Sequence, residues 1–278
     1  MANKCFYITT PIYYASANLH IGHAYCTVMT DIIARYKRER GYDVWFLTGA
    51  DEHGEKIARN AEKAGMQPQE FVDKIAANFH ENWSRLKISN NDFIRTTDQR
   101  HVETVQKAFT MLLEKGDIYL GKYKGWYCTP CESFWTEMQV GEDHVCPDCG
   151  RPVHEESEDA YFLNVKKYIP QLLKFYEEHP EFVPGGKLNE MINTFIKPGL
   201  DDLCITRTSF TWGIPVRENP KHVVYVWIDA LLNYVSALGY LSNDDSKFKK
   251  YWSEGTEIVQ FAGREINSCL LYTSDAAD

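Results

Sequence analysis

The sequence predicts an α/β protein whose doubly wound, parallel sheet is interrupted by an inserted domain of different character. Short apolar runs alternate with segments in which apolar residues recur at helical spacing, which is the order of a parallel sheet connected by helices. The runs are apolar almost throughout, as strands buried on both faces are. Between residues 117 and 221 this rhythm stops, and two closely spaced cysteine pairs and Gly/Pro-rich stretches take its place.

The composition is that of a folded protein. Of the 278 residues, 44% are hydrophobic and 25% are charged, and a chain of this length can bury a large core in one or two domains. The formal net charge of −9 does not attract nucleic acid, so any RNA contact must depend on local basic patches. No stretch approaches the ~18 apolar residues of a membrane span, and the N-terminus lacks a signal peptide. The cysteine pattern suits a reducing compartment, and we therefore expect a cytoplasmic protein without a membrane segment.

Three strands are expected in the first half of the sheet domain, residues 1–116. They are the apolar runs over residues 5–9, 43–48 and 92–95. The helix after the first strand ends at Gly41, and its apolar positions form one stripe, made of Tyr25, Val28, Met29, Ile32, Ile33 and Tyr36. Two further helices begin near Gly54 and at Pro68, and a fourth ends at Gly116.

The α/β pattern resumes over residues 222–266, the second half of the sheet domain. A strand is expected over residues 223–227, a helix follows it, and a last strand covers residues 257–262. The fold is thus a Rossmann-like sheet split by the domain over residues 117–221.

The motif His20-Ile21-Gly22-His23 lies between the first strand and the first long helix. Ligand phosphates bind at this position in open α/β sheets, near the positive end of the helix. Two histidines three residues apart can direct donors at the same oxygens, and Gly22 would let a phosphate or adenine approach the backbone. The alternative is a pair of surface histidines at a helix start.

A second polar block, Asp51-Glu52-His53-Gly54, follows the second strand. Carboxylates at the C-terminal end of a parallel strand can accept hydrogen bonds from a ligand ammonium or hydroxyl group. The alternative is a solvated loop or a helix N-cap.

The cysteine pairs are Cys128 with Cys131 and Cys146 with Cys149. Each Cys-x-x-Cys turn brings two thiolates to one side, and two such turns complete a tetrahedron around one Zn²⁺. Four thiolates leave no open coordination position, so this zinc would be structural. Buried cysteines without metal, or a redox pair, are the alternatives.

Residues 225–234 carry aromatic and aliphatic side chains at helical spacing. Such a stripe is usually part of a hydrophobic core. It could also form the wall of an apolar pocket, where thioether sulfur and aromatic rings make favourable contacts.

Three blocks together resemble the start of methionyl-tRNA synthetases, which belong to class I: YITTPIYY at residues 7–14, HIGH at 20–23 and TGADEHG at 48–54. The resemblance implies that His20 and His23 are catalytic and stabilise the charge that builds on the α-phosphate of ATP, which Gly22 also contacts. It implies that Asp51 holds the amino group of methionine. The methionine side-chain pocket would consist of Ile12, Tyr14, Trp227, Ala230, Leu231, Tyr234 and Ile266.

The segment over residues 261–266 resembles the family's last strand and turn, in which Gly263 approaches adenine and Glu265 binds the ribose hydroxyls. Residues 267–278 depart from the family pattern, with Leu270 where a pocket histidine is expected. We expect this tail to be foreign to the family, and the chain to lack the lysine-bearing loop that completes the ATP site.

The activity implied is ATP-dependent formation of methionyl-adenylate and its transfer to tRNA(Met) in the parent enzyme, with Mg²⁺ accompanying ATP and one structural Zn²⁺ per chain. Little or no activity is expected of this chain by itself. The alternatives are a non-catalytic methionine- or adenosine-binding module and a zinc-ribbon RNA-binding protein. The second is disfavoured because acidic residues surround the cysteine turns.

Overall fold

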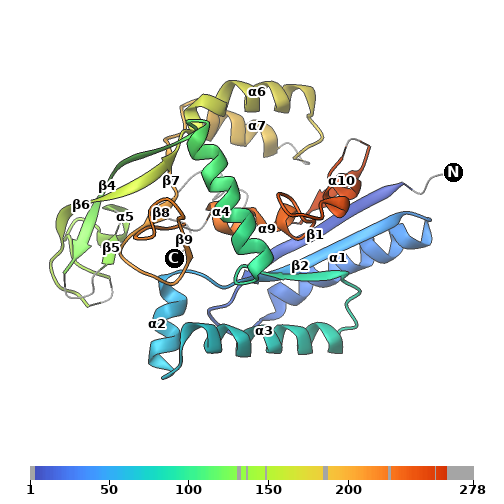
Figure 1. Cartoon of the computed structure of the whole chain (residues 1–278), viewed down its shortest axis with the longest axis horizontal. Coiled ribbons are helices and arrows are strands. Elements are labelled where there is room, and N and C mark those ends of the chain that lie inside the picture. The colour runs from blue at the N-terminus through green and yellow to red at the C-terminus, as the bar shows by residue number, and fades with distance from the viewer. Residues whose placement is uncertain are drawn as a thin grey trace. The chain divides into compact units, whose positions relative to one another are not determined.

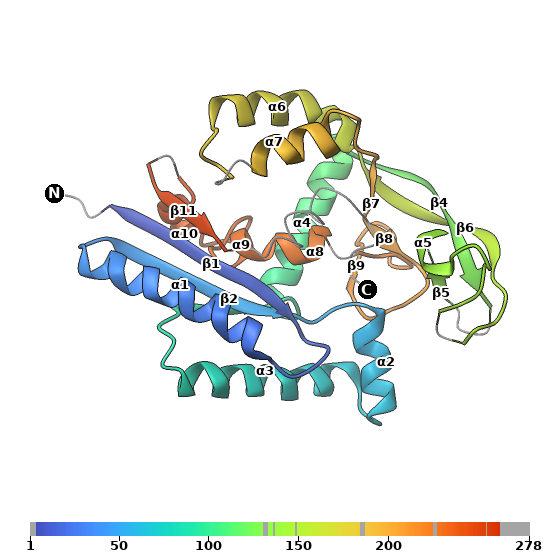
Figure 2. The ribbon, with the colours of Figure 1, turned by 180° about the vertical axis from the view of Figure 1, so that it is seen from behind.

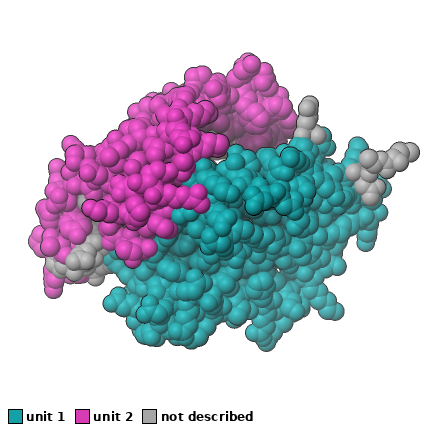
Figure 3. Space-filling view, in the orientation of Figure 1, with its two compact units in different colours: residues 1–108, 212–214, 226–263 teal, residues 109–211, 215–225, 264–278 magenta. Residues whose placement is uncertain are grey.

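The computed structural model describes residues 4–129, 133–135, 137–147, 149–183, 187–224, 227–253 and 255–261. The chain divides into two compact units, each discontinuous in sequence (Figure 3). Unit 1 comprises residues 1–108, 212–214 and 226–263, and unit 2 comprises residues 109–211, 215–225 and 264–278.

Unit 1 contains a four-stranded parallel sheet in the order β11-β1-β2-β3 (Figures 1 and 2). Its strands are β1 (Cys5–Tyr14), β2 (Asp43–Asp51), β3 (Asp92–Arg95) and β11 (Glu257–Gln260). The predicted α/β class with a parallel sheet is confirmed. Strands β1 and β2 continue beyond the apolar runs seen in the sequence, and their register pairs Tyr14 with Asp51.

The helices of unit 1 connect and cover this sheet. They are α1 (Ile21–Glu39), α2 (Glu55–Lys63), α3 (Pro68–Arg85), the first part of α4 (Gln99–Glu114), α8 (Trp227–Leu231), α9 (Asn233–Ser236) and α10 (Ser246–Tyr251). Helix α4 passes into unit 2 at Phe109.

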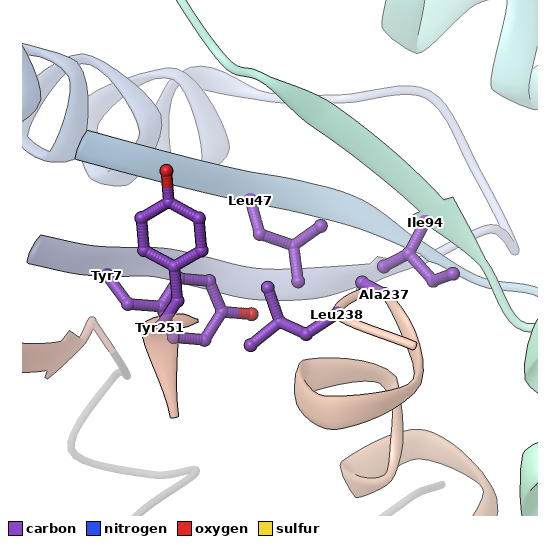
Figure 4. Close-up of a cluster of buried hydrophobic side chains, with 6 residues drawn as sticks. All are labelled: Tyr7, Leu47, Ile94, Ala237, Leu238 and Tyr251. Carbon is purple, nitrogen blue, oxygen red and sulfur yellow. The ribbon is translucent and has the colours of Figure 1, made fainter. Parts of the chain in front are cut away.

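Both faces of the sheet are buried, as the continuous apolar strands predict. On one face, Tyr7, Leu47 and Ile94 pack against the segment that includes α9 and α10 (Figure 4). On the other face, Phe6, Ile8 and Phe46 pack against α1. Neighbouring residues of one strand therefore point to opposite faces, as β geometry requires.

Helix α1 does not bury the apolar stripe that its sequence displays. Tyr25, Ile32 and Tyr36 are 69%, 55% and 57% exposed. The buried residues of α1 are instead Thr27, Thr30, Asp31 and Ala34. The polar members of this set have partners: the Asp31 carboxylate accepts from the Ser89 backbone amide at 2.8 Å, and Thr27 bonds Tyr13 at 2.7 Å.

The strand expected over residues 223–227 does not include Trp227, and residues 225 and 226 lie outside the described part of the chain. Val223–Val224 form β10, which pairs antiparallel with β8 (Thr206–Arg207) in unit 2, and helix α8 already begins at Trp227. An apolar run does not by itself specify its partner strand, so the sequence could not distinguish this small antiparallel sheet from the main parallel one.

Unit 2 is organised around an antiparallel sheet in the order β5-β4-β6-β7. Its strands are β4 (Ile118–Cys128), β5 (Ser133–Trp135), β6 (His154–Leu163) and β7 (Leu203–Cys204). The remaining elements of unit 2 are α5 (Glu137–Val140), a 3-10 turn (Val165–Tyr168), α6 (Ile169–Glu178), α7 (Lys187–Met191) and a π turn (Ile192–Ile196). Strand β9 (Ile214–Pro215) follows β10 in the strand order β8-β10-β9.

Gly49 of β2 occupies a position without room for a side chain. A Cβ at this residue would lie 2.2 Å from the carbonyl oxygen of Ile94 and 2.9 Å from Cγ2 of Ile12. We expect Gly49→Ala to destabilise the protein by about 1–3 kcal/mol, the usual range for overpacking a core. Urea unfolding followed by circular dichroism measures this loss, and an unchanged midpoint would contradict the prediction.

Candidate functional site

The two histidines of the HIGH motif cap the start of α1. The Nδ1 atom of His20 accepts a hydrogen bond from the backbone amide of Gly22 at 3.1 Å, and Nδ1 of His23 accepts from the backbone amide of His20 at 3.0 Å. A neutral ring whose Nδ1 accepts carries its proton on Nε2. Both rings therefore keep an Nε2–H donor at the helix N-terminus, with their centroids 3.9 Å apart.

Gly22 lies so close to the His20 ring that a side chain would not fit at this position. A Cβ there would lie 2.9 Å from Cε1 of His20, so glycine leaves space for the capping ring. Burial and the neighbouring His20 lower the pKa of His23, which favours its neutral form.

The Tyr13 ring packs against the His23 ring. The sequence did not indicate this role of Tyr13. Its ring meets the His23 ring edge-on at 4.9 Å, and its hydroxyl bonds Thr27 at 2.7 Å. Tyr13 lies in an apolar run, so its polar partners could not be identified from spacing alone.

Asp51 ends β2 and lies opposite Tyr14 of β1 in the strand register. Burial and the neighbouring Asp229 carboxylate raise the pKa of Asp51 to about 7, although the His53 ring opposes this shift. A carboxylate with this pKa ionises readily when a cation binds beside it. Its position at the carboxyl end of a central strand is where open α/β sheets bind ligands.

His53 belongs to a buried network that the sequence did not reveal. Its Nδ1 lies 2.6 Å from Asp229 of α8, and the other carboxylate oxygen of Asp229 lies 2.9 Å from Nε2 of His101. Burial alone would raise the pKa of Asp229, but the two histidines outweigh it and lower that pKa to about 2. Burial lowers the pKa of His53, and the attraction of Asp229 reverses this and raises it above the usual range.

Glu52, between Asp51 and His53, has a structural role. It is fully buried, and its carboxylate accepts from Arg95 at 2.7 Å and from Thr97 at 2.5 Å. The block at the end of β2 is therefore not a solvated loop, because Glu52 and His53 are both engaged in buried or half-buried side-chain pairs.

Some of the expected pocket residues come together in unit 1. Ile12 and Tyr234 pack against the same core cluster, and the Tyr7 hydroxyl donates to the Tyr234 carbonyl at 2.7 Å. Burial raises the pKa of Tyr234 to about 12, and the Asp51 charge also acts on it. Tyr14 packs against a different cluster, with Ala15 and Ile57.

Of the other expected pocket residues, the structure describes the side chains of Ala230 and Leu231. Ala230 is half-buried and Leu231 is 38% exposed on α8. Trp227 begins α8, but its side chain lies outside the described residues, as do Gly263, Glu265, Ile266 and residues 267–278. Their roles stay predictions.

Three of the four predicted metal ligands converge in unit 2. The sulfur atoms of Cys128, Cys146 and Cys149 all lie within 4.8 Å of one another, and those of Cys128 and Cys149 are 3.6 Å apart. Thiolates on a tetrahedral zinc with Zn–S bonds of ~2.3 Å lie ~3.8 Å apart, so the cluster fits such an ion. Gly150 has the left-handed φ of 68° that the second turn requires. Cys131 lies outside the described residues.

The chain matches a known protein family, curated proteins and solved structures. The family model for class I tRNA synthetases of the methionine type, "tRNA synthetases class I (M)", matches residues 6–158 and 149–272. The methionine–tRNA ligase of Clostridium tetani is 57% identical over 267 residues, which are 96% of this chain and 41% of that protein. That of Caldanaerobacter subterraneus is 58% identical over 264 residues, covering 95% and 41%. The chain thus spans about two-fifths of the length of these relatives.

Among solved structures, Mycobacterium tuberculosis methionyl-tRNA synthetase bound by methionyl-adenylate superposes with a TM-score of 0.79 at 42% identity, over 90% of this chain and 50% of that one. A second complex of that enzyme with methionyl-adenylate gives a TM-score of 0.82 at 40% identity, over 95% and 52%. No helix within the described part of the chain is long and apolar enough to span a membrane. On these sequence and structural matches, the chain belongs to the methionyl-tRNA synthetase family of class I aminoacyl-tRNA synthetases.

Proposed function

We propose that this chain supplies the methionine- and ATP-binding part of a cytoplasmic methionine–tRNA ligase. The observation that carries the proposal is the placement of Asp51 at the carboxyl end of β2, with a pKa that burial and Asp229 raise to about 7. An ammonium group is the natural partner of such a carboxylate. The solved neighbours of the family contain methionyl-adenylate, which combines an amino acid with a nucleotide.

In the reaction, the methionine carboxylate attacks the α-phosphorus of ATP, an acyl–phosphate bond forms, and pyrophosphate leaves with the electron pair of the broken anhydride. Negative charge grows on the phosphate oxygens, and fixed donors stabilise it. The Nε2–H groups of His20 and His23 are suited to this role, because both Nδ1 atoms are held by the backbone.

Asp51 would fix the amino group, which orients the attacking carboxylate. The thioether side chain would contact Ile12, Tyr14, Trp227, Ala230, Leu231, Tyr234 and Ile266. Gly22, Gly263 and Glu265 would hold the nucleotide, whose phosphates carry Mg²⁺. In the parent enzyme, tRNA(Met) would then accept the methionyl group.

The cysteine cluster would hold one structural Zn²⁺ through Cys128, Cys131, Cys146 and Cys149. The spacing of the three described sulfur atoms supports this. A closed four-thiolate site supplies folding energy to unit 2 and takes no part in adenylation.

The proposed function can be tested by measuring methionine-dependent ATP–pyrophosphate exchange. The assay would compare this chain with a protein of its relatives' length. The chain covers 41% of those relatives, so we propose that it binds methionine but has little or no exchange activity alone, whereas the longer protein is active. Exchange by this chain at the rate of the longer protein would contradict that view. Methionine binding without exchange in both proteins would favour a non-catalytic binding module instead.

A further inference from the structure

A chain of buried hydrogen bonds in unit 1 joins the end of β2 to helices α4, α8 and α9. Asp229 of α8 is contacted by Nδ1 of His53 at 2.6 Å and by Nε2 of His101 at 2.9 Å. The second ring nitrogen of His101 lies 2.8 Å from the hydroxyl oxygen of Ser236. The side chains of His101 and Asp229 are 0% and 2% exposed, so these bonds form where the dielectric is low and their strength is greatest.

Both carboxylate oxygens of Asp229 and both ring nitrogens of His101 have a hydrogen-bond partner. One oxygen of the Asp229 carboxylate faces each histidine, and the two ring nitrogens of His101 face Ser236 and Asp229. The His53 side chain keeps 11% exposure. The network therefore runs from the protein interior to the edge of the region where Asp51 lies.

Two parts of the proposed methionine site meet at this network. Helix α8 carries Ala230 and Leu231 immediately after Asp229, and β2 ends at Asp51, two residues before His53. The bond from Asp229 to His101 fixes α8 to α4. The bond from Asp229 to His53 ties the same helix to the residues that follow β2.

We propose that His53, Asp229 and His101 are positioning residues of the amino-acid site, which anchor the α8 wall and set the charge around Asp51. This rests on the proposed function, because it assigns Asp51 an ammonium ligand. None of the three residues needs to touch the substrate. Their effect passes through Asp51 and through the position of α8.

The charges around Asp51 show why His53 must accompany Asp229. The titratable groups that act on Asp51 are Asp229, His53 and Glu52, and the Asp51 charge in turn acts on Tyr234. Glu52 is neutralised by Arg95 at 2.7 Å. A protonated His53 offsets the repulsion from Asp229, and Asp51 can then ionise near neutral pH.

His53→Gln tests the charge effect. Glutamine is neutral, so Asp51 would face Asp229 without compensation, and ionisation of Asp51 would need a higher pH. For methionine binding measured by calorimetry between pH 6 and 8.5, we expect the pH midpoint to rise by about one unit. At pH 7, where a pKa of about 7 leaves about half of Asp51 ionised, a one-unit rise leaves about a tenth ionised, so binding should be about fivefold weaker. Binding of 4-(methylthio)butanoate, which is methionine without its amino group, should show no such shift.

His101→Leu and His101→Gln test the anchoring effect. Leucine leaves Asp229 with one partner and frees α8, so both methionine and the amine-free analogue should bind about tenfold more weakly at every pH, a loss comparable to one buried hydrogen bond. Glutamine can donate to Asp229 and accept from Ser236, and should restore most of the affinity.

His222→Gln is the matched control, because His222 is a buried histidine of unit 2 that bonds Thr206 at 3.2 Å. It should change thermal stability without changing either affinity or the pH midpoint. Equal losses in the His222 and His101 variants would mean that the network acts only through stability, and would overturn the proposal.

Nuclear magnetic resonance of the histidine rings gives a result that needs no ligand. The His53 titration midpoint should fall in Asp229→Asn, because the charge that holds the ring protonated is removed. If wild-type protein binds no methionine, the proposed function fails. The titration still shows whether the Asp229 charge acts on His53. An unchanged His53 midpoint, or methionine binding whose pH midpoint is unaffected by His53→Gln, would overturn the inference.

Discussion

Replacing Cys146 with serine should release the metal ion and unfold the cysteine-bearing end of unit 2. Apparent zinc-binding free energies at structural sites are about 10–16 kcal/mol, so losing one of the thiolates removes more stability than any other single change considered. The Cys146 and Cys128 side chains are buried with Val140 and Val153, and this small cluster has too little apolar area to hold the segment without the metal.

Metal content and hydrogen exchange measure this effect together. Freshly reduced wild-type protein should contain one zinc ion per chain, and Cys146→Ser should contain much less. Amide exchange should accelerate between residues 126 and 153 while β1 and β2 stay protected. Cys204→Ser, which alters a buried cysteine of β7 outside the cluster, should keep its zinc. Wild-type protein without metal would refute the zinc site.

Asp51→Asn should abolish most methionine binding and at the same time stabilise the protein. Removing one partner of a buried charge pair costs about 2–5 kcal/mol of binding free energy, roughly 30-fold to several thousand-fold in affinity. The neutral amide also removes the cost of burying a carboxylate. Asp51 has a pKa of about 7 in the fold, against ~3.9 for an ordinary aspartate.

The sign of the stability effect follows from these two pKa values. Between about pH 4 and pH 7 the folded state holds the Asp51 proton and the unfolded state does not, so wild-type stability falls as pH rises through this window. The advantage of Asp51→Asn should therefore grow from pH 5 to pH 7 and then level off at no more than about 4 kcal/mol. Urea unfolding at a series of pH values measures it.

Asp73→Asn serves as the comparison for Asp51, since the Asp73 carboxylate is 52% exposed and pairs with Arg95. Its affinity for methionine should equal that of wild type. If Asp51→Asn bound methionine as tightly as Asp73→Asn does, Asp51 would not be the ammonium partner.

The central strands and the chemical motifs could be predicted because their signals are local. Strands β1 and β2 are buried on both faces along most of their length, and burial of this kind favours an apolar residue at nearly every position. The cysteine pairs are likewise local, since a Cys-x-x-Cys turn by itself places two thiolates on one side. The position of the HIGH motif after β1 also follows from chain order alone, and the structure places both histidines at the helix start.

Partner strands and buried polar networks could not be predicted in the same way. The apolar run at Val223 indicated a strand, but its antiparallel pairing with β8 depends on residues elsewhere in the chain. Asp229 contacts His53 and His101 across 176 and 128 residues of sequence. No spacing rule relates positions so far apart, because side-chain hydrogen bonds depend on where the backbone has folded.

Helix α1 shows most directly which features the sequence determines and which features only the tertiary structure determines. The helical spacing from Tyr25 to Tyr36 and the stop at Gly41 predict a helix, which the structure has over Ile21–Glu39. The sequence does not determine which face is buried: Thr27 and Asp31 are buried and Tyr25 is exposed. The reason is energetic. A buried polar group is tolerated once it has a hydrogen-bond partner, and Tyr13 and Ser89 become available as partners only when the fold brings them to the helix.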